Sequence, residues 1–428
     1  MTIEITQSEV RPYAATRRVL LACWLSILFE GYDVGVMGAV LSSMAEDSRW
    51  GLTPMQLGAL SSYALVGMFF GACVAGTLSE RIGRRRMLLL CVGLFSLAML
   101  ATAWAPTPFW FGVARLIGGL GLGGVIPMAA ALTVEYSPPA RRSYNYGIMY
   151  SGYSLGILCA ALVAMWLIPH FGWRSVIGVG ALPLLALVPI ARLLPESLEY
   201  LVSRGRMDEA RQLAQQLGVP LPQTGAPHPG AQQPGWRHTL GLLFSPAWLR
   251  ATLCFWVALF CGMLLVYGLN TWLPTIMRKS GYALGPSLLF LVVFSLTSAI
   301  GGLCLGRIAD RLGARRAVAL SYLLGAAGIC ALMFKHSLGV NILLTGIAGL
   351  GSISASLILT GYLATWYPGA SRAAATGWAL SFARIGAMSG PLFGAWIAGS
   401  GLALSWNFAA FALVSLVAAL AVLLLPRR

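Results

Sequence analysis

The chain has 428 residues, of which 58% are hydrophobic and only 10% are charged, and its formal net charge at pH 7 is +16. Because a soluble domain carries about 25% charged residues, this composition excludes a soluble globular protein and indicates a polytopic membrane protein. The positive charge does not indicate a nucleic-acid partner, since the sequence contains no recognisable nucleic-acid-binding module.

Twelve apolar runs of about 20 residues are long enough to cross a bilayer as helices. In chain order they cover residues 17–40, 55–79, 87–105, 109–133, 144–168, 173–193, 248–273, 285–305, 317–335, 338–363, 372–397 and 402–424. The first run is too long for the apolar part of a signal peptide, so we expect no cleaved leader. The sequence predicts an all-α membrane protein.

A polar segment separates the sixth and seventh runs. Its first part, SLEYLVSRGRMDEARQLAQQLG, has helical periodicity, and its second part, VPLPQTGAPHPGAQQPGW, has the composition of a flexible linker. We therefore predict an N-terminal six-helix bundle over residues 1–193, a cytoplasmic central loop over 194–247 and a C-terminal six-helix bundle over 248–428.

The basic residues predict the orientation in the membrane. With both termini on one side, most of the 29 Lys and Arg residues fall on that side. The opposite side receives only Arg49, Arg174, Arg278, Lys279 and Lys335. Since cytoplasmic loops are enriched in Lys and Arg, both termini are predicted to be cytoplasmic. The same bias predicts contact with the anionic lipids of the bilayer.

The two sets of six runs are internal repeats. GTLSERIGRRR, which starts at Gly76, returns as GRIADRLGARR from Gly306, and GLG at 119–121 returns at 349–351. Both pairs are offset by 230 residues. Within the first span the offset is 237, so that Asp33 matches Asn270. Parallel repeats of six spans are typical of transporters whose substrate site lies near the midplane.

Several motifs carry a resemblance to a known family. GTLSERIGRRR resembles the signature loop of the major facilitator superfamily, with Glu80 in place of the usual Asp, and RLIGGLGLGG resembles its motif in span 4. Within the superfamily, EGYD, EYSPPARR, PESLEYLVSRGR, YGLNTWLP and TGWALSFARIGAMSGP together are similar to the aromatic acid:proton symporters. The sequence departs from that pattern at Glu30, usually Asp, and at Met128, usually Asn.

The resemblance implies the major facilitator fold and import of a small aromatic carboxylate, such as a benzoate, hydroxybenzoate or gentisate, together with protons. It implies a monomer in the inner membrane of a bacterium, with no cofactor. Other readings are uptake of a sugar acid or dicarboxylate, and drug efflux by proton antiport. Span 5 lacks the proline typical of such antiporters. An enzyme is disfavoured because the four histidines lie in loops or at span ends and form no metal cluster.

Glu30 and Asp33 are the candidate proton-coupling residues. Their spacing of three places both on one helical face, and a charged side chain at the bilayer centre costs about 2.5–3.5 kcal/mol. Burial disfavours the charged form of a carboxyl group, so such an acid can load a proton outside and release it inside. The alternative is that both acids reach water at the outer interface. The pair could carry two protons, but adjacent acids often share one, which favours a single proton.

Arg115 and Arg384 are the two cations inside spans. The planar guanidinium of Arg384 suits a substrate carboxylate, with a structural salt bridge as the alternative. Arg115 is predicted to serve proton coupling or packing as much as substrate contact. The remaining candidates for substrate binding are Tyr32, Tyr150, Tyr153, Trp272, Trp378 and Phe382, which could stack on a ring or simply pack, and Asn270, whose amide suits a ring hydroxyl.

The loop motifs supply the candidate gating residues. These are Gly76, Glu80, Arg81, Gly83, Arg84, Arg85, Glu135, Arg142, Asp310 and Arg311. Because an acid occupies the same place in both copies of the loop, we predict that it pairs across the two halves and closes the inward gate. The alternative is that the arginines serve only as cytoplasmic anchors.

Overall fold

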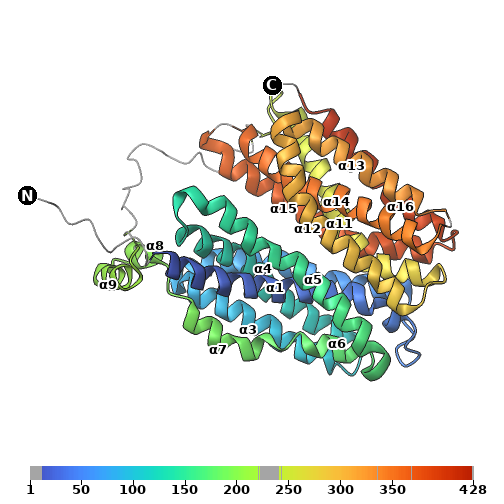
Figure 1. The fold of residues 1–428 in the computed structure, drawn as a ribbon, viewed down its shortest axis with the longest axis horizontal. Coiled ribbons are helices and arrows are strands. Elements are labelled where there is room, and N and C mark those ends of the chain that lie inside the picture. Colours follow the sequence, from blue (N-terminus) through green and yellow to red (C-terminus); the bar gives the residue numbers. More distant parts are fainter. Residues whose placement is uncertain are drawn as a thin grey trace, which may run out of the picture. The chain divides into compact units, whose positions relative to one another are not determined.

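The computed structural model describes residues 12–219, 221, 241, 243–334, 336–367 and 369–426. Within these residues the regular secondary structure is entirely helical (Figure 1). The predicted flexible linker, residues 219–236, lies outside them except for residues 219 and 221. An all-α fold is therefore confirmed for the part of the chain that the structure describes.

Helices lie at all twelve predicted spans. In chain order they are α1 (Pro12–Ala45), α2 (Pro54–Ile82), α3 (Arg84–Ala103), α4 (Pro108–Glu135), α5 (Arg142–Phe171), α6 (Trp173–Val179) with α7 (Pro183–Leu193), α11 (Leu249–Lys279), α12 (Leu284–Leu312), α13 (Ala314–Ala331), α14 (Leu338–Trp366), α15 (Gly369–Gly399) and α16 (Ser405–Leu423). Ten of these spans are long and apolar enough to cross a membrane by length and composition, and α13 and α15 lie at the ninth and eleventh predicted spans.

The sixth span is broken into two helices. Helix α6 gives way to turns at residues 180–182, and α7 then begins at Pro183. Proline has no backbone N–H and its ring clashes with the preceding helical turn, so it kinks or breaks a helix, but it is well suited to the first helical position. The single run predicted over 173–193 is therefore two helices joined by a turn.

Two short helices follow the sixth span. Helix α8 (Leu198–Ser203) begins at the N-cap Ser197, and α9 (Met207–Leu217) ends at Gly218. Gly218 has a φ of 65°, the left-handed conformation that favours glycine after a helix. Figure 1 places α8 and α9 together beyond one end of the helices of the first half. The helical periodicity read from this segment is confirmed.

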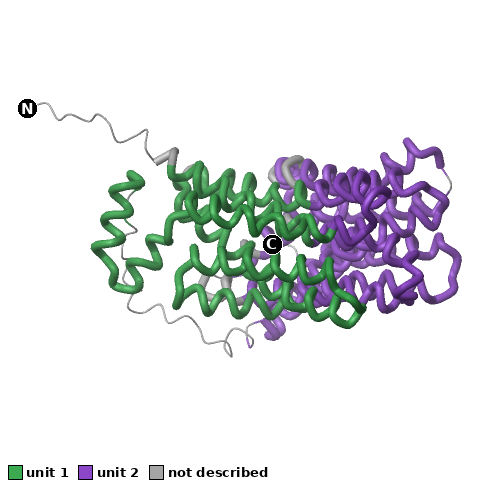
Figure 2. The backbone as a smooth tube through the Cα atoms, turned by 90° about the horizontal axis from the view of Figure 1, so that it is seen from below, with its two compact units in different colours: residues 1–33, 66–156, 177–227 green, residues 34–65, 157–176, 228–428 purple. Residues whose placement is uncertain are grey.

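The chain forms two compact units, shown in Figure 2. The first contains residues 1–33, 66–156 and 177–227, and the second contains 34–65, 157–176 and 228–428. The second unit therefore includes one end of α1, α2 and α5 as well as all described helices from α11 onward. The division into bundles at 1–193 and 248–428 stays a prediction.

Glycines on α4 allow it to lie between α2 and α3 in the first unit. A Cβ on Gly123 would overlap the backbone of α2 near Met68, and a Cβ on Gly121 would lie 2.7 Å from the carbonyl oxygen of Cys91 on α3. Small residues permit such close approach of helix backbones in membranes. The glycine-rich motif of span 4 is thus explained by packing on two faces.

A similar device operates in the second unit between α11 and α15. A Cβ on Gly386 would overlap the carbonyl oxygen of Phe260, and one on Gly390 would lie 2.7 Å from the backbone nitrogen of Gly268. The end of α1 packs on the same helix, where Gly38 lies against the carbonyl oxygen of Asn270. The small residues of span 11 therefore allow its close packing on α11.

We expect Gly31→Ala to destabilise the protein. A Cβ at Gly31 on α1 would overlap the backbone carbonyl of Tyr153 on α5, and overpacking costs about 1–3 kcal/mol. Gly147→Ala is the matched control, since no atom lies within 4 Å of a Cβ at Gly147, which is also on α5. Thermal unfolding in detergent should show a lower midpoint for the first variant only. Equal midpoints would contradict the close packing of α1 and α5.

Candidate functional site

The centre of the first unit contains a buried ion pair. Nη1 of Arg115 on α4 lies 2.5 Å from Oδ1 of Asp33 on α1. The two residues are 4% and 1% exposed. The sequence singled out both residues separately, but it did not predict their pairing.

Few other polar groups are available to hydrogen-bond with Asp33 and Arg115. Among the described residues, Oδ2 of Asp33 and Nε of Arg115 have no hydrogen-bond partner. Nη1 of Arg115 also lies 3.3 Å from the sulfur of Met99 on α3. Removal of one member of such a pair would leave a buried charge without compensation, which is strongly unfavourable. The two charges therefore depend on each other.

Glu30 lies one helical turn before Asp33 on α1. Its side chain is completely buried, and Asp33 is 1% exposed. Neither acid therefore reaches water at the surface. This result argues against the alternative in which both acids are hydrated at the outer interface. Tyr32, between them in sequence, is also buried.

Two of the predicted aromatic residues, Tyr150 and Tyr153, belong to a stack along α5. The rings of Tyr150 and Tyr153 have centroids 5.8 Å apart and planes 19° apart. Tyr146 continues the stack, with its centroid 6.1 Å from that of Tyr150. Tyr153 is buried whereas Tyr146 is 38% exposed, so the row runs from the interior toward the surface. The sequence analysis missed Tyr146, although its spacing of four from Tyr150 places them on one face.

Arg384 lies on α15 in the second unit and is half-buried. Two residues earlier, the ring of Phe382 stacks on Trp256 of α11 at 5.0 Å with an angle of 25° between the planes. Trp378, one turn before Phe382, is 40% exposed. Trp256 was not singled out from the sequence, because nothing in the chain order indicates that α11 and α15 are neighbours.

Trp272 and Asn270 have evident packing roles on α11. The indole N–H of Trp272 donates to the carbonyl oxygen of Pro391 at 2.8 Å, and the ring lies against Gly394 of α15. The amide of Asn270 donates to the carbonyl oxygen of Val34 on α1 at 3.5 Å. Both side chains are at most 3% exposed. Substrate contact by either residue stays a prediction.

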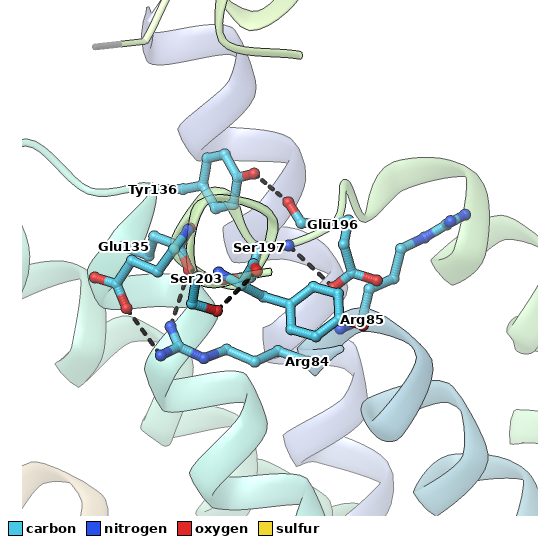
Figure 3. A network of polar contacts seen from close by, with 9 residues as sticks. Arg84, Arg85, Glu135, Tyr136, Glu196, Ser197 and Ser203 are labelled. Atoms are coloured by element: carbon cyan, nitrogen blue, oxygen red, sulfur yellow. Dashed lines mark hydrogen bonds and ion pairs between the residues drawn. The ribbon is translucent and has the colours of Figure 1, made fainter. Parts of the chain in front are cut away.

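The signature loop of the first half is bound to the segment after the sixth span (Figure 3). Arg84 forms ion pairs with Glu135 at 3.0 Å and with Glu199 at 2.8 Å. The hydroxyl of Ser197 donates to Glu135 at 2.7 Å, and so does the backbone N–H of Glu199 at 3.0 Å. We call Arg84, Glu135, Ser197 and Glu199 the Arg84 network.

The Arg84 network uses the first turn of α8. Ser197 caps that helix by accepting from the backbone N–H of Tyr200. The carboxylate of Glu135 therefore receives a hydrogen bond from a helix N-terminus as well as the charge of Arg84. Glu135 has a side chain only 4% exposed, so these contacts compensate its burial.

Gly83 and Arg85 hold a second acid of the same segment. The backbone N–H of Arg85 donates to Glu196 at 3.0 Å. Gly83 has a φ of 98°, and a Cβ there would lie 2.7 Å from a carboxylate oxygen of Glu196. The glycine is thus required both by its backbone conformation and by the close approach of this carboxylate.

Of the remaining predicted gating residues, Glu80, Arg81, Arg142 and Arg311 are exposed, and the carbonyl oxygen of Arg81 accepts hydrogen bonds from the side chains of Tyr200 and Arg204. No described residue forms an ion pair with Glu80, Arg81, Arg142 or Arg311, and open space surrounds Gly76. The side chain of Asp310 lies outside the described part. The cross-half pairing of Glu80 and Asp310 stays a prediction, whereas the observed ion pairs of the loop involve Arg84. In the described residues, no group of His, Cys, Asp and Glu side chains could hold a metal ion.

Comparison with protein families decides the class of protein. The model of the Major Facilitator Superfamily matches residues 23–294 and 285–428, which together span nearly the whole chain. The chain belongs to the Major Facilitator Superfamily. The protein is therefore a transporter rather than an enzyme, and the helices at the twelve predicted spans belong to the superfamily's fold.

Full-length relatives within the superfamily transport aromatic acids. The chain is 32% identical to the benzoate transport protein of Acinetobacter baylyi over 99% of this chain and 92% of that one. It is 35% identical to the gallate transporter of Pseudomonas putida, over 96% and 92%. It is also 35% identical to the 4-hydroxybenzoate transporter PcaK of Pseudomonas aeruginosa, over 91% and 87%. The resemblance to aromatic acid transporters is thereby confirmed.

Solved structures of the superfamily share the fold. The partially occluded inward open conformation of the xylose transporter XylE from E. coli superposes with a TM-score of 0.73, covering 95% of this chain and 96% of that one. The nucleoside transporter NupG superposes with a TM-score of 0.72. Their identities to this chain are 17% and 14%, so these likenesses concern the fold alone.

We expect the Arg84 network to stabilise the first unit through charge pairing. A double-mutant cycle of Arg84→Gln and Glu135→Gln should give a coupling free energy of at least about 1 kcal/mol in thermal unfolding, since both residues belong to one partly buried network. The matched control is the exposed pair Arg206–Glu209, at 2.5 Å, whose cycle should show no coupling beyond error. Additive effects of the Arg84 and Glu135 substitutions would contradict the network.

Proposed function

We propose that the protein imports a small aromatic carboxylate, of the benzoate, hydroxybenzoate or gentisate class, in symport with protons. Relatives named for benzoate, gallate and 4-hydroxybenzoate match it over nearly its whole length. The observation that carries the coupling to protons is the buried pair of Asp33 and Arg115. An acid that can gain or lose a proton beside a fixed cation supplies the required chemistry.

Asp33 is the proposed proton carrier. Its carboxylate is compensated by Arg115, so a proton that binds Asp33 removes this compensation and leaves the Arg115 charge exposed to the apolar interior. Protonation therefore changes the electrostatics of the interface between α1 and α4. Such a change can bias a carrier between two conformations, as alternating access requires. Glu30, buried one turn away, is proposed to tune Asp33 or to carry a second proton.

Arg384 is the proposed partner of the substrate carboxylate. The guanidinium presents a planar fork that matches the two oxygens of a carboxylate. Phe382, two residues before Arg384 on α15, stacks on Trp256 of α11 with ring centroids 5.0 Å apart. These two rings are a candidate surface for the aromatic ring of the substrate. In the first unit, the tyrosine row of α5 is a second candidate surface for the ring.

The proposed setting is the inner membrane of a bacterium, with both termini in the cytoplasm, and the proposed transporting form is a monomer. The excess of Lys and Arg in the predicted cytoplasmic loops supports this orientation. The signature loops then lie at the cytoplasmic face, where they are proposed to gate access between the two predicted bundles. The Arg84 network is proposed to keep the first of these loops in place.

Counterflow in proteoliposomes tests the substrate class. Vesicles that contain the purified chain and unlabelled 4-hydroxybenzoate should accumulate labelled benzoate or 4-hydroxybenzoate, whereas labelled xylose should not accumulate. Uptake into empty vesicles should require an inward proton gradient and should stop when a protonophore is added. Counterflow of a sugar acid or dicarboxylate in preference to these aromatic acids would favour the other uptake reading.

Asp33→Asn should abolish uphill accumulation because the amide cannot carry a proton. Counterflow, which needs no net proton movement, should be retained at least in part. The matched comparison is Glu30→Gln on the same helical face, which should keep accumulation if Asp33 alone carries the proton. Initial uptake with and without a proton gradient measures both. Continued concentration of substrate by Asp33→Asn would refute its role, and loss of accumulation in Glu30→Gln would show that Glu30 also titrates.

Arg384→Ala should weaken substrate binding by at least about 30-fold, since truncation of one partner of a buried charge pair costs about 2–5 kcal/mol. Arg316→Ala, an exposed arginine on α13, is the control and should bind normally. Isothermal titration with 4-hydroxybenzoate compares the two. An unchanged affinity in Arg384→Ala would move the carboxylate site to Arg115.

A further inference from the structure

A cavity of about 770 Å³ opens in the first unit beside the signature loop. Its walls come from the start of α1, the start of α3, the end of α7 and one face of α9. The amphipathic helix α9 buries Ala210 and Ala214 and turns Gln212 and Gln216 toward the cavity. The predicted topology places this cavity at the cytoplasmic face, where lipid headgroups lie.

The cavity is strongly basic. Five arginines line it, Arg18, Arg85, Arg86, Arg192 and Arg206, against two acids, Glu196 and Glu209. Both acids are already engaged. Glu209 pairs with Arg206 at 2.5 Å, and Glu196 accepts the backbone N–H groups of residues 85 and 197.

The positive charges of three of these arginines are not paired with an acid of the described residues. Within the described residues, Arg18, Arg86 and Arg192 form no ion pair. All three are exposed at the cavity. Guanidinium groups that converge without a counter-charge form a natural site for a phosphate, which accepts bidentate hydrogen bonds from arginine.

An apolar groove of about 750 Å³ continues from this cavity between α3 and α7. The two share Arg86, Val188 and Ala191. The groove is lined by exposed apolar side chains, including Leu90, which is 57% exposed, and Leu97, which is 56% exposed. Figure 1 shows α3 and α7 side by side along the first unit, and they are packed neighbours.

We propose that the cavity and the groove together bind one anionic phospholipid of the predicted cytoplasmic leaflet. Its phosphate lies among Arg18, Arg86 and Arg192, and one acyl chain lies along the leucines of α3. From Arg86 to Leu97 the helix rises about 16 Å at about 1.5 Å per residue, which is close to half of a hydrocarbon core about 30 Å thick. The groove therefore matches a single leaflet, and basic cavities between membrane helices suit anionic headgroups.

Native mass spectrometry of the delipidated full-length protein tests this site. Dioleoyl phosphatidylglycerol should bind as one tightly retained molecule, and dioleoyl phosphatidylcholine should bind much more weakly. The double variant Arg86→Gln/Arg192→Gln should lower the affinity for phosphatidylglycerol about 30-fold, since each arginine near an anionic lipid contributes about a fivefold factor. The variant Arg86→Lys/Arg192→Lys, which keeps both positive charges, should keep most of the affinity. This result would show that the glutamine variant loses affinity through loss of charge and not through misfolding.

Repeat symmetry supplies the matched controls. Arg316 is the counterpart of Arg86 at the offset of 230, and Arg307→Gln/Arg316→Gln removes the same charge from the second signature loop. This control should bind phosphatidylglycerol normally. For the groove, Leu90→Trp should weaken binding by filling the path of the acyl chain, whereas Leu320→Trp, at the repeat counterpart on α13, should not.

Three outcomes would overturn the proposal. Equal affinity for the two lipids would show that the arginines do not select the headgroup. Equal losses in the two double glutamine variants would show only a general effect of charge. Competition by millimolar glycerol 3-phosphate or inorganic phosphate, together with normal binding in Leu90→Trp, would assign the cavity to a soluble phosphate instead. Each measurement is independent of the transported substrate.

Discussion

The ion pair of Asp33 and Arg115 is the interaction on which the interior of the first unit depends. Each charge alone would be costly to bury, and each is held where it is by the other at 2.5 Å. Their approach requires α1 and α4 to lie close together, and the glycines that follow Arg115 let α4 settle between α2 and α3. The glycine packing of α4 and the ion pair between α1 and α4 therefore favour the same helix arrangement. A change in the ion pair is expected to alter the helix packing as well.

The repeats share this packing but not this charge. Gly121 of α4 lies against α3, and its counterpart Gly351 of α14 lies against Gly325 of α13, so both halves use glycine at the same contact. At the offset of 230, however, Arg115 corresponds to Thr345, which is completely buried, and at the offset of 237 that holds in the first span Asp33 corresponds to Asn270. In the second repeat, neutral side chains therefore occupy the positions that correspond to the ion pair of the first repeat. In the proposed function, proton chemistry thus belongs to the first repeat and Arg384 serves the substrate in the second.

Much of the fold follows from the sequence because its signals are local. Hydropathy predicts the spans, and the helical periodicity after the sixth span predicts the helical segment that contains α8 and α9. The partners of charged residues are not local signals. Asp33 and Arg115 are separated by 82 residues, and Glu135 meets Arg84 and Glu199 only because three distant segments converge. The broken sixth span also escaped prediction, since Pro183 in an apolar run is compatible with a kinked helix as well as with a turn.

The same electrostatics gives a physical basis for coupling in the proposed cycle. In the empty carrier, Asp33 and Arg115 cancel each other. A proton on Asp33 adds one positive charge to the interior, and a carboxylate that arrives with it adds one negative charge. Empty and fully loaded carriers therefore have the same net charge, whereas a carrier with the proton alone holds an extra positive charge at a cost of several kcal/mol. Because the carboxylate also neutralises Arg384 in the proposed cycle, binding of the proton without the substrate is the state that this electrostatics disfavours most, which opposes a proton leak.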